Sequence, residues 1–232
     1  MRLVLLVAQK QKIATKENIM KIIFFGDSAT DSKRIRTSNE AGRIPETYSI
    51  EPNTYGSGYV FLTAAQLFYE KPQYYQILNR GIGGDRLPQL YARIQLDVWN
   101  EKPDVLNILV GANDMVRDGN PNPTDLKRWG RLYRIMIEET LERLPDVKII
   151  ICEPFCMPEA KRHLLKPYAE EARKIAEEFN LPYVMLQERL LKAVDVYGPE
   201  NIFYDGIHPN LVASKIIADE WIRVFKEQVI KE

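Results

Sequence analysis

A short apolar run, residues 22–25, ends at once in Gly26-Asp27-Ser28, and this feature most restricts the fold. An apolar run of about four to eight residues next to a turn signal is typical of a strand buried on both faces, as in a parallel sheet. Gly26 allows a sharp turn where the strand ends. Ser28 is therefore predicted at the carboxyl edge of a sheet, where open α/β folds bind their ligands.

Similar apolar runs alternate with segments of helical spacing along the rest of the chain. They predict further strands at 75–78, 105–110, 147–152 and 181–186, and helices at 58–69, 87–99, 124–144, 158–179 (interrupted near Pro167), 187–196 and after Pro209. This alternation predicts a three-layer α/β/α sandwich with a five-stranded parallel sheet. The polar residues 31–57 are predicted to form a long loop.

The first 19 residues differ from the remainder of the chain. Their apolar stretch, residues 3–8, is shorter than the roughly 7–15 apolar residues of a secretory signal, and a polar basic spacer follows it. We interpret 1–19 as an extension in front of a single domain, 20–232, with an edge strand at 3–8 as the alternative.

Composition excludes several classes of function. The chain has 32 basic and 32 acidic residues, so no net charge attracts nucleic acid or anionic lipid. No apolar run approaches the roughly 20 residues of a membrane-spanning helix. Cys152 and Cys156 have neither redox nor zinc-site spacing, which favours small buried side chains and suits the cytoplasm. Any catalytic imidazole must be His163 or His208, and the charged helical run around His163 places that residue on the surface.

The segments at the predicted strand ends carry the side chains of acyl transfer. A serine hydroxyl needs a base, and imidazole suits this because its pKa lies near neutrality. Asp205 precedes His208 by three residues, close enough to orient the ring. The Ser28 amide, the Gly83-Gly84 turn and the Asn113 side chain are candidate donors to an oxyanion. Taken singly, each has a structural alternative, such as a helix cap for Asp205 or a turn for Asn113.

Taken together, these segments resemble a known family. Gly26-Asp27-Ser28, Asn79-x4-Gly84-Asp85, Gly111-x-Asn113-Asp114 and Asp205-x-x-His208 are similar to the four sequence blocks of the SGNH (GDSL-type) hydrolases. The resemblance covers about residues 20–225 and implies a flavodoxin-like three-layer fold. It implies Ser28 as nucleophile, His208 as base and Asp205 as its orienting acid. It also implies an oxyanion hole made by the Ser28 amide, Gly84 (rather than Gly83) and Asn113.

Further local patterns narrow the resemblance. Thr30-Asp31-x-x-Arg34 and Gly56-x-Gly58-Tyr59 are similar to small bacterial carbohydrate acetyl esterases of the acetyl-xylan esterase type. This implies candidate substrate contacts at Asp27, Arg34, Tyr59 and Arg117. Met115-Val116-Arg117 stands where that branch often has a tryptophan after the Asn-Asp pair, so the substrate walls differ. The segments 31–57 and 118–123 are expected to border the pocket.

The predicted function is a serine esterase that removes small acyl groups, acetyl above all, from a carbohydrate. Three alternatives stay open: a lysophospholipase or thioesterase of the same fold, a flavodoxin-like domain that binds FMN or phosphate, and a silent sugar-binding module. Repulsion from Asp27 and Asp31 disfavours an anionic ligand in the first loop. We expect a small-molecule ester as substrate, no cofactor, no metal, and neither nucleic acid nor membrane as partner. A homo-oligomer is left open.

Overall fold

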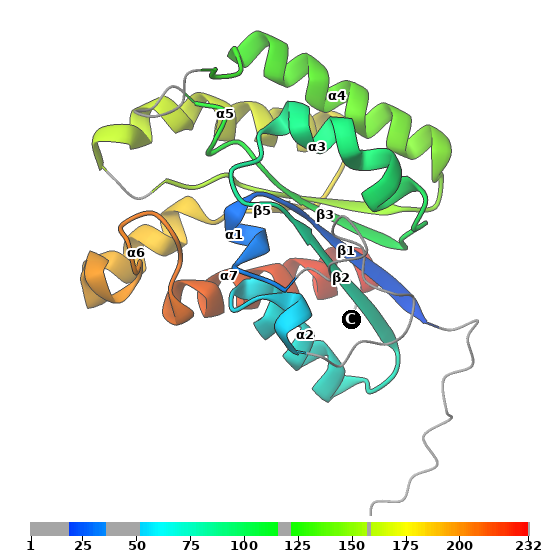
Figure 1. Ribbon diagram of the computed structural model, residues 1–232, viewed down its shortest axis with the longest axis horizontal. Helices are drawn as coiled ribbons and strands as arrows, with labels where there is room; N and C mark the ends of the chain where they lie inside the picture. The colour runs from blue at the N-terminus through cyan, green and yellow to red at the C-terminus, as the bar shows by residue number, and fades with distance from the viewer. Residues whose placement is uncertain (1–18, 36–51, 116–121, 157–158, 232) are drawn as a thin grey trace, which may run out of the picture.

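The computed structural model describes residues 19–35, 52–115, 122–156 and 159–231, and shows a parallel sheet between two layers of helices (Figure 1). The strands are β1 (Met20–Gly26), β2 (Tyr75–Gly81), β3 (Val105–Leu109), β4 (Lys148–Cys152) and β5 (Tyr183–Val184). Their order in the sheet is β2-β1-β3-β4-β5, and every pair is parallel. The predicted fold class is confirmed.

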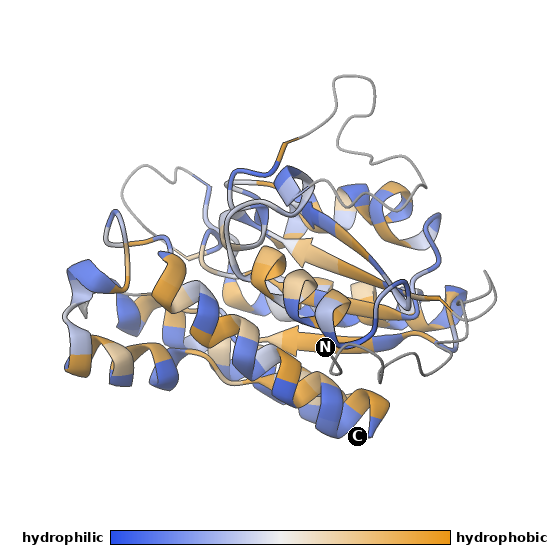
Figure 2. Ribbon diagram, turned by 90° about the horizontal axis from the view of Figure 1, so that it is seen from below, coloured by the Kyte–Doolittle hydropathy of each residue, from blue (hydrophilic) through white to orange (hydrophobic). Residues whose placement is uncertain are grey.

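Strand β1 lies inside the sheet, and its side chains divide between the two layers. Ile22 stands in register with Ile77 of β2 and Val105 of β3. Ile22 and Phe24 join one hydrophobic cluster, whereas Ile23 and Phe25 join the other. This two-residue period follows from the pleat of a strand. Because both faces are covered, most strand residues are hydrophobic, as the mainly orange arrows of Figure 2 show.

Each layer of helices covers one of these clusters. On one face lie α2 (Tyr59–Glu70), α6 (Gln187–Tyr197), α7 (Leu211–Val224) and the π-helical η5 (Phe225–Ile230). On the other face lie α3 (Leu87–Ile94), the π-helical η3 (Gln95–Trp99), α4 (Leu126–Arg143) and α5 (Glu159–Glu178). This arrangement leaves the carboxyl edge of the sheet for the loops that follow each strand.

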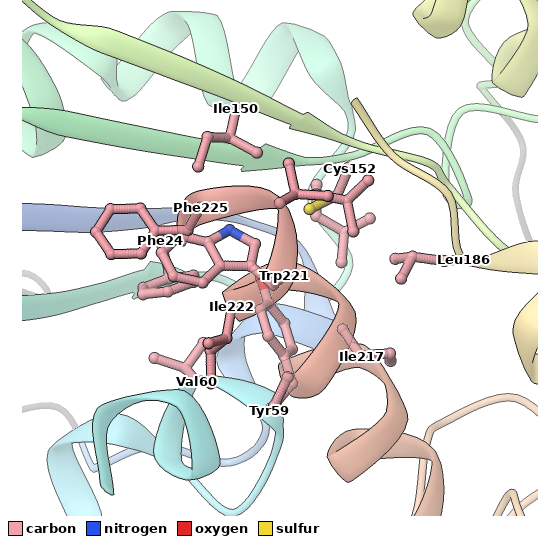
Figure 3. Packing of buried hydrophobic residues seen from close by; sticks show 14 of the residues in the cluster. Phe24, Tyr59, Val60, Ile150, Cys152, Leu186, Ile217, Trp221, Ile222 and Phe225 are labelled. Atoms are coloured by element: carbon pink, nitrogen blue, oxygen red, sulfur yellow. The ribbon is translucent and has the colours of Figure 1, made fainter. Parts of the chain in front are cut away.

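Trp221 of α7 forms the centre of the first cluster (Figure 3). Its ring stacks on Phe225 with centroids 5.0 Å apart and packs against Phe24 at 4.8 Å. The indole N–H donates to Asn107 Oδ1 at 2.8 Å, and Asn107 Nδ2 donates to the Tyr59 hydroxyl at 3.2 Å. Asn107 is a fully buried residue of β3. Its amide is therefore satisfied by partners from two helices, which fixes how α2 and α7 sit on the sheet.

The structure departs from the sequence prediction in several elements. Helix α5 continues through Pro167, although an interior proline removes a hydrogen bond and crowds the preceding turn, because Leu165, Tyr168 and Ala172 anchor the helix in the core. Strand β5 has only two residues, since pairing with β4 is limited to Ile151 and Cys152. The helix predicted over 87–99 changes to π geometry after Ile94. The expected edge strand at 3–8 and most of the loop 31–57 lie outside the described residues.

No helix in the described part of the chain has the length and hydropathy needed to cross a membrane. Both cysteines are buried, as their spacing predicted, and form no disulfide within the described residues.

Candidate active site

Ser28 begins α1 (Ser28–Asp31), a single helical turn directly beyond the end of β1. Asp27 caps this turn, and its Oδ1 accepts a hydrogen bond from the Ala29 amide at 3.0 Å. Gly26 is required at the junction, because a Cβ there would lie 2.4 Å from Thr30 Oγ1 and 2.5 Å from the Leu109 carbonyl oxygen. The turn therefore packs tightly on the ends of the central strands, and Ser28 is held at the carboxyl edge as predicted.

His208 is carried by a tight loop between η4 (Pro199–Asn201) and α7. The Tyr204 amide donates to the His208 carbonyl at 3.2 Å, and Phe203 pairs with Pro209, so the loop is closed at its base. Inside it, Asp205 Oδ1 accepts from the Ile207 amide at 3.0 Å and from the His208 amide at 2.7 Å. These two amides thus hold the carboxylate in position for its contact with the ring.

The two segments meet in one chain of hydrogen bonds. Asp205 Oδ2 lies 2.7 Å from His208 Nδ1, and His208 Nε2 lies 3.0 Å from Ser28 Oγ. Partial burial would raise the pKa of Asp205, but hydrogen bonds from the His208 amide and ring and from the Ile207 amide lower it below its usual range. An ionised carboxylate only accepts, so Nδ1 carries the proton and Nε2 accepts from the serine hydroxyl. This arrangement can move the Ser28 proton onto the imidazole.

Candidate donors to an oxyanion lie beside Ser28. The Gly83 amide donates to Asp31 Oδ2 at 2.9 Å, whereas the Ser28 and Gly84 amides have no acceptor among the described residues. Gly84 has φ +85°, a conformation that glycine adopts readily. Asn113 Nδ2 donates to the Asp85 carbonyl at 2.9 Å, which orients the side-chain amide. The geometry therefore favours Gly84 over Gly83 as the backbone donor from this turn.

A cavity of about 330 Å³ joins these groups. Ser28, Gly84, Asn113 and His208 all line it. Asp27, Ala29 and Gly83 also line it, and the rest of its wall is apolar and is formed by Leu109, Val110, Ala112, Pro154, Phe155, Ile207 and Pro209. The cavity is large enough for a small ligand, and its polar groups gather at the Ser28 end.

Two buried carboxyl groups lie close to this cavity. Burial raises the pKa of Asp27 from 3.8 to about 7, with further increases from the charges of Asp114 and Asp85. Burial also raises the pKa of Asp114 from 3.8 to about 6, against the hydrogen bonds from the Leu87 amide. Asp114 holds the start of α3 through that amide, at 3.1 and 3.2 Å. Among the described residues, no three His, Cys, Asp or Glu side chains are grouped to hold a metal ion.

The predicted substrate contacts have different positions. Asp27 lines the cavity, although it is only 4% exposed. Tyr59 is 1% exposed, and its hydroxyl bonds Thr30 and Asn107 inside the core. Arg34 is also buried, and its Nε donates to the Gly81 carbonyl at 3.1 Å. Both therefore support the scaffold rather than contact a ligand, which corrects the sequence prediction. Arg117 lies outside the described residues.

Several residues near the site were not predicted from the sequence. The Asp31 carboxylate accepts a hydrogen bond from the Gly83 amide and so fixes this turn. The Thr30-Asp31 pattern next to Ser28 was the sequence signal that could have indicated this role. Pro154 and Phe155 form the apolar wall, and their place just beyond β4 was a signal that they reach the same edge. Tyr204 stacks on His208 with centroids 5.7 Å apart and 16° between the rings. The exposed surface residue His163 lies outside the cavity, as expected.

Comparison with known proteins identifies the family of this chain. Residues 24–215 match the GDSL-like lipase/acylhydrolase family. An acetylxylan esterase of Geobacillus stearothermophilus is 28% identical over 88% of this chain and 92% of its own length. Structures have been solved for two catalytic mutants of that esterase, in which an aspartate and a histidine three positions apart are each replaced by alanine. The structure of the aspartate mutant matches this chain with a TM-score of 0.76 at 27% identity, over 88% of this chain and 93% of its own length.

Two further relatives extend the comparison. A thioesterase 1/protease 1/lysophospholipase L1 of Escherichia coli is 29% identical over 62% of this chain and 64% of its own length. The structure of a putative GDSL-like lipase from Parabacteroides merdae has a TM-score of 0.78 at 32% identity, over 92% of this chain and 98% of its own. On the match over most of its length and the shared fold, this chain belongs to the GDSL-like lipase/acylhydrolase family and is a carboxylic ester hydrolase.

Proposed function

We propose that this protein is a serine esterase that removes acetyl and other small acyl groups from carbohydrates. The observation that carries this proposal is the hydrogen-bonded chain Asp205–His208–Ser28 at the polar end of the cavity. The catalytic mutants of the acetylxylan esterase support it, because the three-residue spacing of their aspartate and histidine is that of Asp205 and His208. Family membership leaves the flavin-binding alternative without support.

In the proposed reaction, Ser28 Oγ attacks the acyl carbon while His208 Nε2 takes its proton. Asp205 keeps the ring oriented and stabilises the imidazolium that forms. The carbonyl oxygen becomes an oxyanion, which the Ser28 and Gly84 amides and the Asn113 side chain stabilise. The C–O bond to the alcohol then breaks, and His208 returns the proton to the leaving oxygen. Water, deprotonated by His208, attacks the acyl-enzyme and releases the acid and the free serine.

The small acyl group is supported by the similarity to the acetylxylan esterase along nearly the whole chain. The rival assignment, a lysophospholipase or thioesterase, is favoured by the apolar wall of Phe155, Val110 and Ile207 and by the Escherichia coli relative. An acyl chain would gain about 0.8 kcal/mol for each CH₂ that it buries against this wall. The two assignments therefore predict opposite dependences on acyl length.

A cytoplasmic location stays a prediction from composition.

The test is hydrolysis of acetylated xylosides and of 4-nitrophenyl esters from C2 to C12, with Ser28→Ala as control. We expect the highest kcat/KM on acetyl esters, loss of turnover in Ser28→Ala, and labelling of Ser28 by a serine-directed phosphonate. Faster hydrolysis of C8–C12 esters than of acetyl esters, with acetylated xylosides unchanged, would favour the lysophospholipase or thioesterase assignment. Activity in Ser28→Ala would show that the nucleophile is misassigned.

A further inference from the structure

A second pocket shares Ser28 and His208 with the main cavity but contains none of the other candidate oxyanion donors. We call it the side pocket. Ser32, Lys33, Ser57, Tyr204, Asn210 and Leu211 complete its lining together with Pro209, and its volume is about 380 Å³. An ester held at Ser28 has an acyl part and an alcohol part, which must leave the reacting carbon in different directions. The two pockets provide two such directions.

The chemistry of the two pockets distinguishes their occupants. The main cavity presents Leu109, Val110 and Phe155, which suit an acyl group. The side pocket presents two serine hydroxyls, a tyrosine and a lysine, which suit a hydroxylated alcohol. His208 borders both pockets, so it can return a proton to an oxygen that leaves toward the side pocket. The alcohol of the substrate is therefore expected in the side pocket.

Lys33 gives this pocket a charge preference. Its Nζ lies 5.1 Å from the centre of the Tyr204 ring, and within the described residues the ammonium group has no ion pair. No acidic residue is among the described residues that line the pocket. Two carboxylates lie next to lining residues in the sequence. Asp31 accepts from the Gly83 amide and pairs with Arg34, and Asp205 is held by the His208 ring and two backbone amides.

The backbone also directs Lys33 toward this position. Ser32 and Lys33 both have positive φ, at 42° and 60°, in the left-handed region that non-glycine residues seldom adopt. The Ser32 carbonyl accepts from the Ser57 amide at 2.9 Å and from the Ser57 hydroxyl at 3.1 Å, which holds this conformation. At Ser32 this is the left-handed C-cap that ends α1, and it sets the direction in which the chain continues to Lys33.

We propose that the side pocket binds the alcohol part of the ester and that this alcohol carries an anionic group, such as a carboxylate, which pairs with Lys33. The substrate class is then an acyl ester of an acidic, hydroxyl-rich compound. This inference rests on the proposed esterase function and adds to it the identity of the alcohol side.

The test compares two acetyl esters that differ only at C6, a carboxylate in methyl glucuronoside and a hydroxymethyl group in methyl glucoside, each acetylated at the same ring hydroxyl. The measured quantity is the ratio of kcat/KM for the acidic ester to kcat/KM for the neutral ester. Intrinsic reactivity cancels when this ratio is compared between enzyme variants. We expect Lys33→Gln to lower the ratio about two- to fivefold, the upper part of the range for one exposed ion pair. The effect should shrink at 0.5 M NaCl, where the Debye length is only about 4 Å.

Lys174→Gln is the matched control, because it removes the same charge from an exposed position of α5 outside the pocket. It should keep the ratio of the unsubstituted enzyme. An equal ratio in Lys33→Gln and the unsubstituted enzyme, or an equal fall in Lys174→Gln, would overturn the inference while the esterase function stands. If neither sugar ester nor 4-nitrophenyl acetate is hydrolysed in a Ser28-dependent way, the proposed function fails and the inference fails with it.

Discussion

Replacing Asp27 by asparagine should remove a pH-dependent loss of stability. The carboxyl is 4% exposed, and burial raises its pKa from 3.8 to about 7. The folded protein therefore holds this proton more tightly than the unfolded chain does. The stabilising contribution of the protonated carboxyl is complete below pH 3.8, decreases as the pH rises through about 7, and is lost above that. At about 1.4 kcal/mol per pKa unit, the full loss is about 4 kcal/mol.

Asparagine keeps the Oδ1 acceptor for the Ala29 amide but cannot ionise. Urea unfolding at 25 °C gives the free energy of unfolding of both proteins at pH 5 and at pH 8. Between these two values, the unsubstituted protein should lose about 3 kcal/mol relative to Asp27→Asn. Asn113 Nδ2 lies 3.5 Å from Asp27 Oδ2, and the loss of this contact in Asp27→Asn affects both pH values alike, so the difference between them reports the ionisation.

The control for net charge is Asp146→Asn, which removes an exposed carboxylate before β4. If Asp27→Asn loses stability from pH 5 to pH 8 as steeply as the unsubstituted protein, or no less steeply than Asp146→Asn, the reasoning is refuted. Asp27 would then be ionised in the folded protein across this range. A positive result would show that the helix cap beside the nucleophile is protonated in mildly acidic solution.

Three further predictions concern the site and its support. Asn113→Ala should lower kcat by roughly 10²–10³, the usual effect of losing one oxyanion donor, and a change in KM alone would assign Asn113 to substrate binding. Gly81→Ala should abolish activity and lower the Tm, because the new Cβ would lie 2.2 Å from the Asp31 backbone nitrogen. In the control Gly83→Ala the new Cβ would make only ordinary contacts, so this variant should fold, and equal Tm values for the two variants would contradict the prediction. A chain that starts at Met20, where β1 begins, should keep full kcat/KM, and insolubility would show that residues 1–19 belong to the domain.

The sequence by itself predicted a five-stranded parallel sheet and the succession of strands and helices along the chain. Short apolar runs that alternate with helical spacing permit few arrangements, because buried parallel strands need crossover helices on both faces. The position of Ser28 at the sheet edge was predictable because Gly26 marks the end of a strand. The contact between Asp205 and His208 was predictable because a spacing of three residues keeps both within one loop. These features depend on local geometry, which the sequence encodes directly. The match to the GDSL-like lipase/acylhydrolase family confirms the family predicted from the sequence.

Only the tertiary structure decided which polar side chains face the ligand. Tyr59 and Arg34 were predicted at the substrate, yet α2 docks with the Tyr59 hydroxyl turned toward Asn107, and Arg34 folds back onto the Gly81 carbonyl. The raised pKa of Asp27 depends on burial by several elements. Lys33 and Tyr204 come from opposite ends of the chain and meet over one pocket. Side-chain direction and desolvation are set by how elements pack together, and no local pattern in the sequence specifies that packing.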